Sequence, residues 1–184
     1  GSTREISLIF WGMALGAFGL VLGPWLGGSL PPTVSGLILH LSATIWLIVL
    51  MGRALKAGGQ LDSAGGWHML ASYSWILLPV LVAPLILLGF TEGGPIESTA
   101  PQALIYGWML QFGVALIPFS ARRFFLREEK PQLGGSWLSL AGITLGSIFI
   151  WVSIFIIPAR GMLYGLGFAL YALAMIPPVR ELFE

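Results

Sequence analysis

Six long runs of apolar residues, separated by short segments rich in glycine and proline, constrain this chain more than any other feature. A helix needs roughly 20 apolar residues to cross the hydrocarbon core of a bilayer, and the runs come close to that length. They cover residues 6–26, 34–51, 67–90, 101–119, 137–158 and 162–177. No apolar–polar alternation persists long enough for the strands of a barrel. The sequence therefore predicts an all-α integral membrane protein, a bundle of six transmembrane helices in one domain over residues 1–184.

The composition supports a membrane location and narrows the range of partners. Hydrophobic residues make up 57% of the chain and charged residues only 9%, whereas a soluble domain carries about 25% charged residues. This excess of apolar surface indicates the lipid bilayer and other membrane subunits as partners. The net charge of +1 argues against nucleic acid, which requires a basic face. The sequence contains no cysteine, which excludes disulfides, iron–sulfur clusters and cysteine-bound zinc.

The distribution of the nine basic residues predicts the orientation of the helices. If the runs alternate in direction, eight of the nine fall on one side of the membrane and only Arg160 falls on the other. The eight are Arg4, Arg53, Lys56, Arg122, Arg123, Arg127, Lys130 and Arg180. Positively charged loops stay on the cytoplasmic side. We therefore expect a multi-pass protein of the cell's inner (plasma) membrane with both termini in the cytoplasm.

The apolar runs contain no Asp, Glu, Lys or Arg. Proton-coupled carriers and ion pumps usually keep such a residue within the membrane. Glu92 and Glu97, for example, follow the third run instead of interrupting it. The sequence also lacks the motifs of zinc proteases, serine hydrolases and phosphate-binding loops. We therefore expect no proton-driven transport, and a chain that is not catalytic on its own.

Four pairs of glycines, each spaced four residues apart, lie within or beside the apolar runs. They are Gly12 and Gly16, Gly19 and Gly23, Gly142 and Gly146, and Gly161 and Gly165. Such a pair lies on one face of a helix and lets another backbone approach closely. The favoured interpretation is ordinary packing within one bundle, and the alternative is pairing between two copies of the chain.

His40 lies in the outer half of the second predicted helix and is the only histidine well inside an apolar run. A buried imidazole requires a partner. One interpretation is metal ligation, because haem iron, the magnesium of a chlorophyll-type pigment or copper each accepts an imidazole nitrogen. The other is a hydrogen bond to a neighbouring helix. Gly36, Ser42 and Ala43 are small, so we expect them to leave room for a flat macrocycle beside His40.

Two further residues bear on a haem site. Met109 lies at a depth similar to that of His40, and His/Met ligation of haem is common. It is therefore the candidate second ligand of a haem b held by His40, although methionine also fills gaps in cores. His68 begins the third run at the cytoplasmic end and is predicted to be an interfacial residue. Gln111, in the fourth run, is an alternative bridge between helices.

Two segments resemble a known family. Residues 37–47, Leu-Ile-Leu-His-Leu-Ser-Ala-Thr-Ile-Trp-Leu, resemble the second helix of haem-copper oxidase subunit I and its nitric oxide reductase relatives. In that helix a histidine in the outer half ligates the low-spin haem, a role that would fall to His40. Residues 102–108 and 118–124 are similar to a helix of oxidase-like proteins of the nitric-oxide-response type. The resemblance implies half of such a fold without its copper-binding histidines, since Ala100, Pro101 and Gln102 stand where the second pattern has histidine.

These observations lead to one main hypothesis and two alternatives. The main hypothesis is a small oxidase-like membrane subunit. It either holds haem through His40 or is an accessory part of a respiratory or photosynthetic electron-transfer complex. The first alternative is a structural membrane subunit without a cofactor. The second is a carrier for a neutral or apolar solute, which needs no buried charge.

The predicted orientation can be tested by labelling, because the chain has no native cysteine. In intact cells a Glu128→Cys variant should resist a membrane-impermeant thiol reagent, because we place that loop in the cytoplasm. A Glu92→Cys variant, on the predicted outer side, should react with the same reagent and is the matched control. Reaction of the Glu128→Cys variant from outside would contradict the orientation.

Overall fold

The computed structural model describes residues 2–87, 94, 96, 101–102 and 104–181. Every regular element in this part of the chain is a helix, which confirms the predicted all-α class. Three described segments are long and apolar enough to cross a membrane, namely Thr3–Trp25, Leu30–Ala57 and Ile157–Glu181. A further apolar helix, Trp137–Ser153, is shorter. The chain divides into two compact units, Gly1–Ala54 and Leu55–Glu184.

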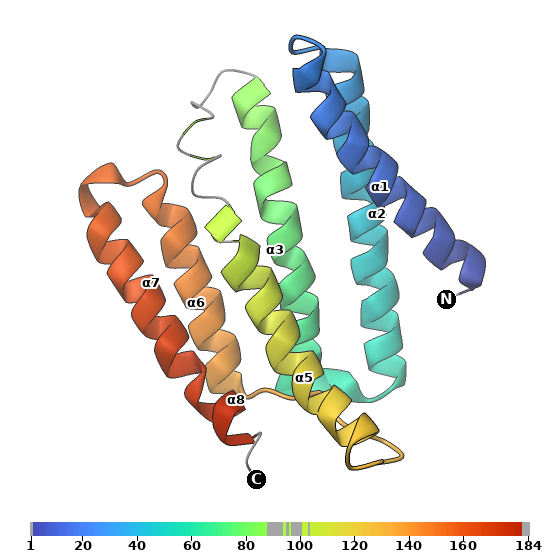
Figure 1. Cartoon of the computed structure of the whole chain (residues 1–184), viewed down its shortest axis with the longest axis vertical. Coiled ribbons are helices and arrows are strands. Elements are labelled where there is room, and N and C mark those ends of the chain that lie inside the picture. Colours follow the sequence, from blue (N-terminus) through green and yellow to red (C-terminus); the bar gives the residue numbers. More distant parts are fainter. Residues whose placement is uncertain (1, 88–93, 95, 97–100, 103, 182–184) are drawn as a thin grey trace. The chain divides into compact units, whose positions relative to one another are not determined.

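The first unit is a helical hairpin of α1 (Thr3–Trp25) and most of α2 (Leu30–Ala57) (Figure 1). Ser2 caps α1, since its Oγ accepts from Glu5 N (3.3 Å) while its own N donates to Glu5 Oε2 (2.7 Å). This reciprocal pair satisfies two amides that the first helical turn leaves open. The turn between the helices contains Gly27 and Gly28, with φ of 72° and 83°. Glycine adopts these angles without steric cost, so the chain reverses over residues 26–29.

Glycines on one face of α1 bring the two helix backbones into contact. A Cβ built on Gly16 would lie 2.6 Å from the His40 backbone nitrogen, and one built on Gly19 would lie 2.9 Å from Gly36 Cα. Real side chains do not tolerate such distances, so glycine is required at these positions. The predicted packing within the bundle is therefore confirmed for the glycine pairs of α1.

The second unit contains the remaining helices. In chain order they are η1 (Gln60–Asp62), α3 (Ala64–Leu87), the π-helix η2 (Ile105–Leu110), α5 (Gln111–Phe124), α6 (Trp137–Ser153), η3 (Ile157–Ala159), α7 (Arg160–Ala174) and α8 (Ile176–Glu181). α5 and α6 both contact α3, and α7 packs along α6. Figure 1 shows that α3 and α6 run in one direction and that α5 and α7 run in the opposite one. The beginnings of α3 and α6 thus share one end of the unit with the end of α5 and with α8.

Glycines also set the spacing of α6 and α7. A Cβ built on Gly142 would lie 2.7 Å from a methyl group of α7, and one on Gly146 would lie 2.9 Å from the Gly167 carbonyl oxygen. Packing within the bundle is confirmed for this pair. It is wrong for Gly161 and Gly165, because a Cβ on either would have no neighbouring atom within 4 Å. Gly161 and Gly165 lie on the exposed side of α7. Gly167 lies on the opposite side of this helix and contacts α6.

The helices follow the predicted runs approximately in the part that the structure describes, but α6 ends at Ser153, five residues before the end of the run 137–158. α2 extends beyond the run 34–51 at both ends, because the helix continues through Arg53 and Lys56. The fourth run is divided between η2 and α5, and the last between α7 and α8. Residues 88–90 and the loop with Glu92 and Glu97 lie outside the described residues. The number of crossings, the orientation and the single domain stay predictions.

The contact between α1 and α2 predicts that a side chain at Gly16 disrupts the hairpin. In detergent a Gly16→Leu variant should unfold at a lower temperature than the wild type, since overpacking costs about 1–3 kcal/mol. Ala17→Leu adds similar bulk at an exposed position of the same helix and should leave the unfolding temperature nearly unchanged. Circular dichroism during heating provides the measurement. Equal unfolding temperatures for the two variants would contradict the packing.

Candidate functional site

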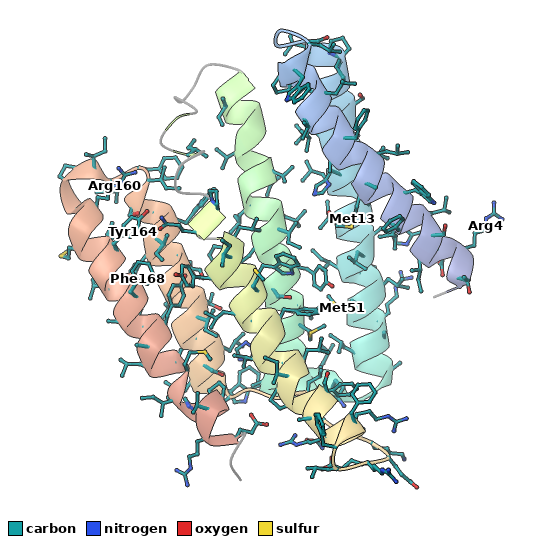
Figure 2. All side chains as sticks on the ribbon, viewed as in Figure 1. Arg4, Met13, Met51, Arg160, Tyr164 and Phe168 are labelled. Atoms are coloured by element: carbon teal, nitrogen blue, oxygen red, sulfur yellow. The ribbon has the colours of Figure 1, made fainter. Side chains whose placement is uncertain are left out.

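His40 lies where α2 is in contact with α1 at Gly16. Its Nδ1 is 3.3 Å from the carbonyl oxygen of Met13, which is labelled on α1 in Figure 2. A carbonyl oxygen only accepts hydrogen bonds, so this bond requires the tautomer with the proton on Nδ1, in which Nε2 has the lone pair. The interhelical hydrogen bond predicted as the alternative to ligation is thus present. The same bond is also the kind that fixes a metal-binding imidazole through its other nitrogen.

On the side that faces α1, the surroundings of His40 do not provide the space that the sequence suggested for a macrocycle, whereas Ser42 is exposed. A Cβ built on Gly36 would lie 2.6 Å from the Leu20 backbone nitrogen, and Ala43 Cβ lies 3.0 Å from the position of a Cβ on Gly12. The expectation that Gly36 and Ala43 leave room is therefore wrong, because α1 fills that face of α2. A flat ligand at Nε2 would have to lie along another face of the helix.

Met109, the proposed second ligand, lies on η2 in the second unit and is 55% exposed. Its side chain lines an apolar groove together with residues of α5 and α8. His40 belongs to the first unit and Met109 to the second. Ligation of one haem by both residues stays a prediction.

His68 is fully buried in the second unit, whereas we expected an interfacial residue to be exposed; its depth in the membrane stays a prediction. Its Nε2 lies 2.9 Å from Ser139 Oγ and 3.4 Å from Ser136 O. Ser139 Oγ gives its own hydrogen to Ser136 O (2.7 Å). Both neighbours therefore accept, so His68 donates from Nε2 and leaves Nδ1 without a proton. Ser136 and Ser139 also form the capping box of α6. The imidazole thus joins α3 to the start of α6.

The segment before α6 closes over His68. Gly135 has a φ of 99°, and a Cβ there would lie 2.7 Å from His68 Cδ2. The Gly135 amide donates to Glu181 Oε2 (3.0 Å), and Arg122 donates to Glu181 Oε1 (3.0 Å). One carboxylate therefore connects α8, α5 and the loop at the end of the unit where the imidazole is buried.

Two further polar pairs connect neighbouring helices. Gln111 Nε2 donates to Thr144 Oγ1 (3.1 Å), which joins α5 to α6. Ser147 Oγ and the Tyr171 hydroxyl lie 2.9 Å apart and join α6 to α7. Gln111 and Ser147 have no exposed surface. The predicted role of Gln111 as a bridge between helices is confirmed.

The π-helix η2 sets the position of aromatic side chains around these pairs. A Cβ on Gly107 would lie 2.5 Å from the indole of Trp75, so glycine is needed for that indole to pack against the wide turn. Tyr106 stacks on Tyr171 with ring centroids 4.9 Å apart and meets Phe168 edge-on at 5.4 Å. Single π-turns recur at functional sites. Here the turn presents the Tyr106 side chain to α7 and the backbone of Gly107 to α3.

Some buried polar atoms of this interior lack a hydrogen-bond partner within the described part of the chain. They include His68 Nδ1, Gln111 Oε1 and Trp108 Nε1. An unpaired buried group costs about 1–3 kcal/mol. Within residues 2–87 and 104–181 no three histidines or carboxylates come together as a metal site.

No protein-family model matches the chain, and no curated protein or solved structure matches it either. The resemblance of residues 37–47 to an oxidase helix therefore stays a prediction.

The sequence did not predict the burial of His68. Only Trp67 precedes it in the third apolar run, which suggested a position at the membrane surface. Two signals in the sequence could have found it. His68 and Ser72 are four residues apart and share one helix face, and both are fully buried. The spacing of Ser136 and Ser139 is that of a helix cap, which places polar groups at the start of α6.

Replacing His68 should destabilise the second unit. We expect His68→Ala to lower the free energy of unfolding by about 2–4 kcal/mol, because it leaves a cavity and removes a buried hydrogen bond. Ser74→Ala, at an exposed position of the same helix, is the matched control and should have little effect. A double-mutant cycle with Ser139→Ala should give a coupling of about 0.5–3 kcal/mol. Additive effects of the two substitutions would contradict the pair.

Proposed function

We propose that this chain is a small accessory subunit of a larger membrane complex and has no catalytic centre of its own. One observation carries the proposal: most of the buried polar side chains of the second unit join helices to one another, and Ser72 and Ser153 bond to their own helix. The pairs His68–Ser139, Gln111–Thr144 and Ser147–Tyr171 are all of this kind. Hydrogen bonds of this type hold helices together in lipid. The resemblance to oxidase helices favours a respiratory or photosynthetic electron-transfer complex as the assembly.

The exposed surface supports the same proposal. Many large apolar side chains of both units are exposed, and several exceed half of their full accessible surface. Examples are Phe10, Phe18, Ile38, Ile117, Leu138 and Leu173. Surfaces of this kind require lipid or partner subunits.

The proposal includes six spans with both ends in the cytoplasm. α3 has 24 residues, which corresponds to about 36 Å of helix and exceeds the roughly 30 Å of a hydrocarbon core. In the second unit the α5–α6 loop and α8 lie at one end, and Arg160 lies at the other, where α7 begins (Figure 2). This unequal distribution of basic residues within one unit supports the orientation.

Haem binding at His40 is a second candidate function, and the bond between His40 Nδ1 and Met13 O is the observation that favours it. That bond directs the lone pair of Nε2 away from α1, as an axial ligand requires. His40 would supply the axial nitrogen to the iron of haem b, and the haem would supply electron transfer.

One preparation tests both candidates. Extraction from native membranes in a mild detergent should give a particle larger than the 19.8 kDa of this chain, because partner subunits accompany it. Mass spectrometry of the particle identifies those subunits. A wild-type chain that migrates alone after mild extraction would contradict the accessory role.

The absorption spectrum of the same particle, reconstituted with variants, separates the two candidates. If His40 binds haem, His40→Ala should remove the Soret band of this chain, whereas His68→Ala should leave it in place. A chain that is colourless when made in haem-replete cells would contradict the second candidate alone.

A further inference from the structure

An apolar groove of about 220 Å³ runs along the second unit where α5 faces the junction of α7 and α8. Its walls include Met109, Gly113 and Ile117 on one side and Met175 and Val179 on the other. From Met109 to the Pro118 wall the groove follows nine residues of helix, or about 13 Å along the axis. Its length and apolar walls suit one hydrocarbon chain lying parallel to the helices.

The two ends of the groove differ in charge. At the Met109 end the neighbouring helix carries no charge. At the other end Arg122 follows Pro118 by one turn of α5, and Arg180 directly follows Val179 on α8. Arg123 is exposed and donates to the carbonyl oxygens of Glu128 and Glu129, and Arg180 is exposed as well. Glu181 is bound to Arg122, and these three arginines and one carboxylate together carry a positive formal charge.

We propose that the groove binds one phospholipid with an anionic headgroup. Its acyl chain lies between α5 and α8, and its phosphate lies near Arg122 and Arg180, which follow the groove-lining Pro118 and Val179 along their helices. The positive charge at one end suits the anionic headgroup of such a lipid, and the apolar groove suits its acyl chain. The positive end is also the end that the proposed orientation places at the cytoplasmic leaflet, where anionic lipids concentrate. The proposal rests on the membrane location, and it does not depend on the accessory role.

Gly113 provides a variant that blocks the groove without disturbing the fold. A Cβ at this position would meet only Ile117 Cδ1, at an ordinary contact distance of 3.6 Å. Gly113→Leu therefore extends into the groove and occupies the place of the acyl chain. Gly165→Leu on the open face of α7, where a Cβ meets nothing within 4 Å, adds the same bulk away from the groove.

The test uses the purified full-length chain in nanodiscs of phosphatidylcholine with phosphatidylglycerol as a minor component. Native mass spectrometry after release counts the lipids that remain bound. We expect the wild type and Gly165→Leu to retain one phosphatidylglycerol, and Gly113→Leu to lose it. Arg180→Gln should weaken retention about fivefold, the effect of about one basic residue at a membrane surface. Arg4→Gln removes the same charge far along the sequence and should not change retention.

Each contrary result overturns the proposal. Equal retention of phosphatidylcholine and phosphatidylglycerol would show that the headgroup is not recognised. Equal retention by Gly113→Leu and the wild type would show that the groove does not hold the lipid, and absence of lipid from both would point to a partner helix as its occupant. A phosphatidylglycerol retained by a chain that purifies alone would leave this inference intact and contradict only the accessory role.

Discussion

The structure depends on one constraint: polar side chains within an apolar bundle must find hydrogen-bond partners, either on their own helix or on a neighbouring one. The bond between His68 and Ser139 is the clearest case. It is fully buried, it joins α3 to the cap of α6, and the loop above it is closed by Glu181. Since an unpaired group would cost about 1–3 kcal/mol in such surroundings, these bonds select one register among the helices. The apolar contacts alone would permit others.

Glycine supplies the second condition, because interhelical bonds of about 3 Å require backbones that lie close together. In the first unit Gly16 and Gly19 allow α2 to approach α1, which places His40 beside the Met13 carbonyl. In the second unit Gly146 does the same for α6 and α7, beside the Ser147–Tyr171 pair. Close packing and polar pairing thus occur at the same places. These pairs use polar groups of the chain to join its own helices, which supports the proposed accessory role.

The sequence predicted the helical class and the approximate helix positions, because long uncharged runs leave the backbone no other way to satisfy its hydrogen bonds. It also predicted the role of Gln111 as a bridge. It did not predict the burial of His68. The position of His68 near the start of the third apolar run suggested the membrane surface, whereas the segment before α6 folds over the side chain. That segment lies about 70 residues further along the chain, a separation that local patterns do not reveal. The prediction that Gly36 and Ala43 leave space beside His40 was wrong for a related reason. Small residues that leave room for a ligand also allow another helix to pack there.

The central claim is that this chain is an integral membrane bundle, and extraction of native membranes tests it most directly. Membranes that contain the chain are washed with alkaline carbonate and then with mild detergent, and both supernatants are assayed for it. The account predicts that carbonate leaves the chain in the membrane pellet and that only detergent releases it, with its helical circular dichroism intact. Release by carbonate as a folded, monodisperse protein would contradict the account.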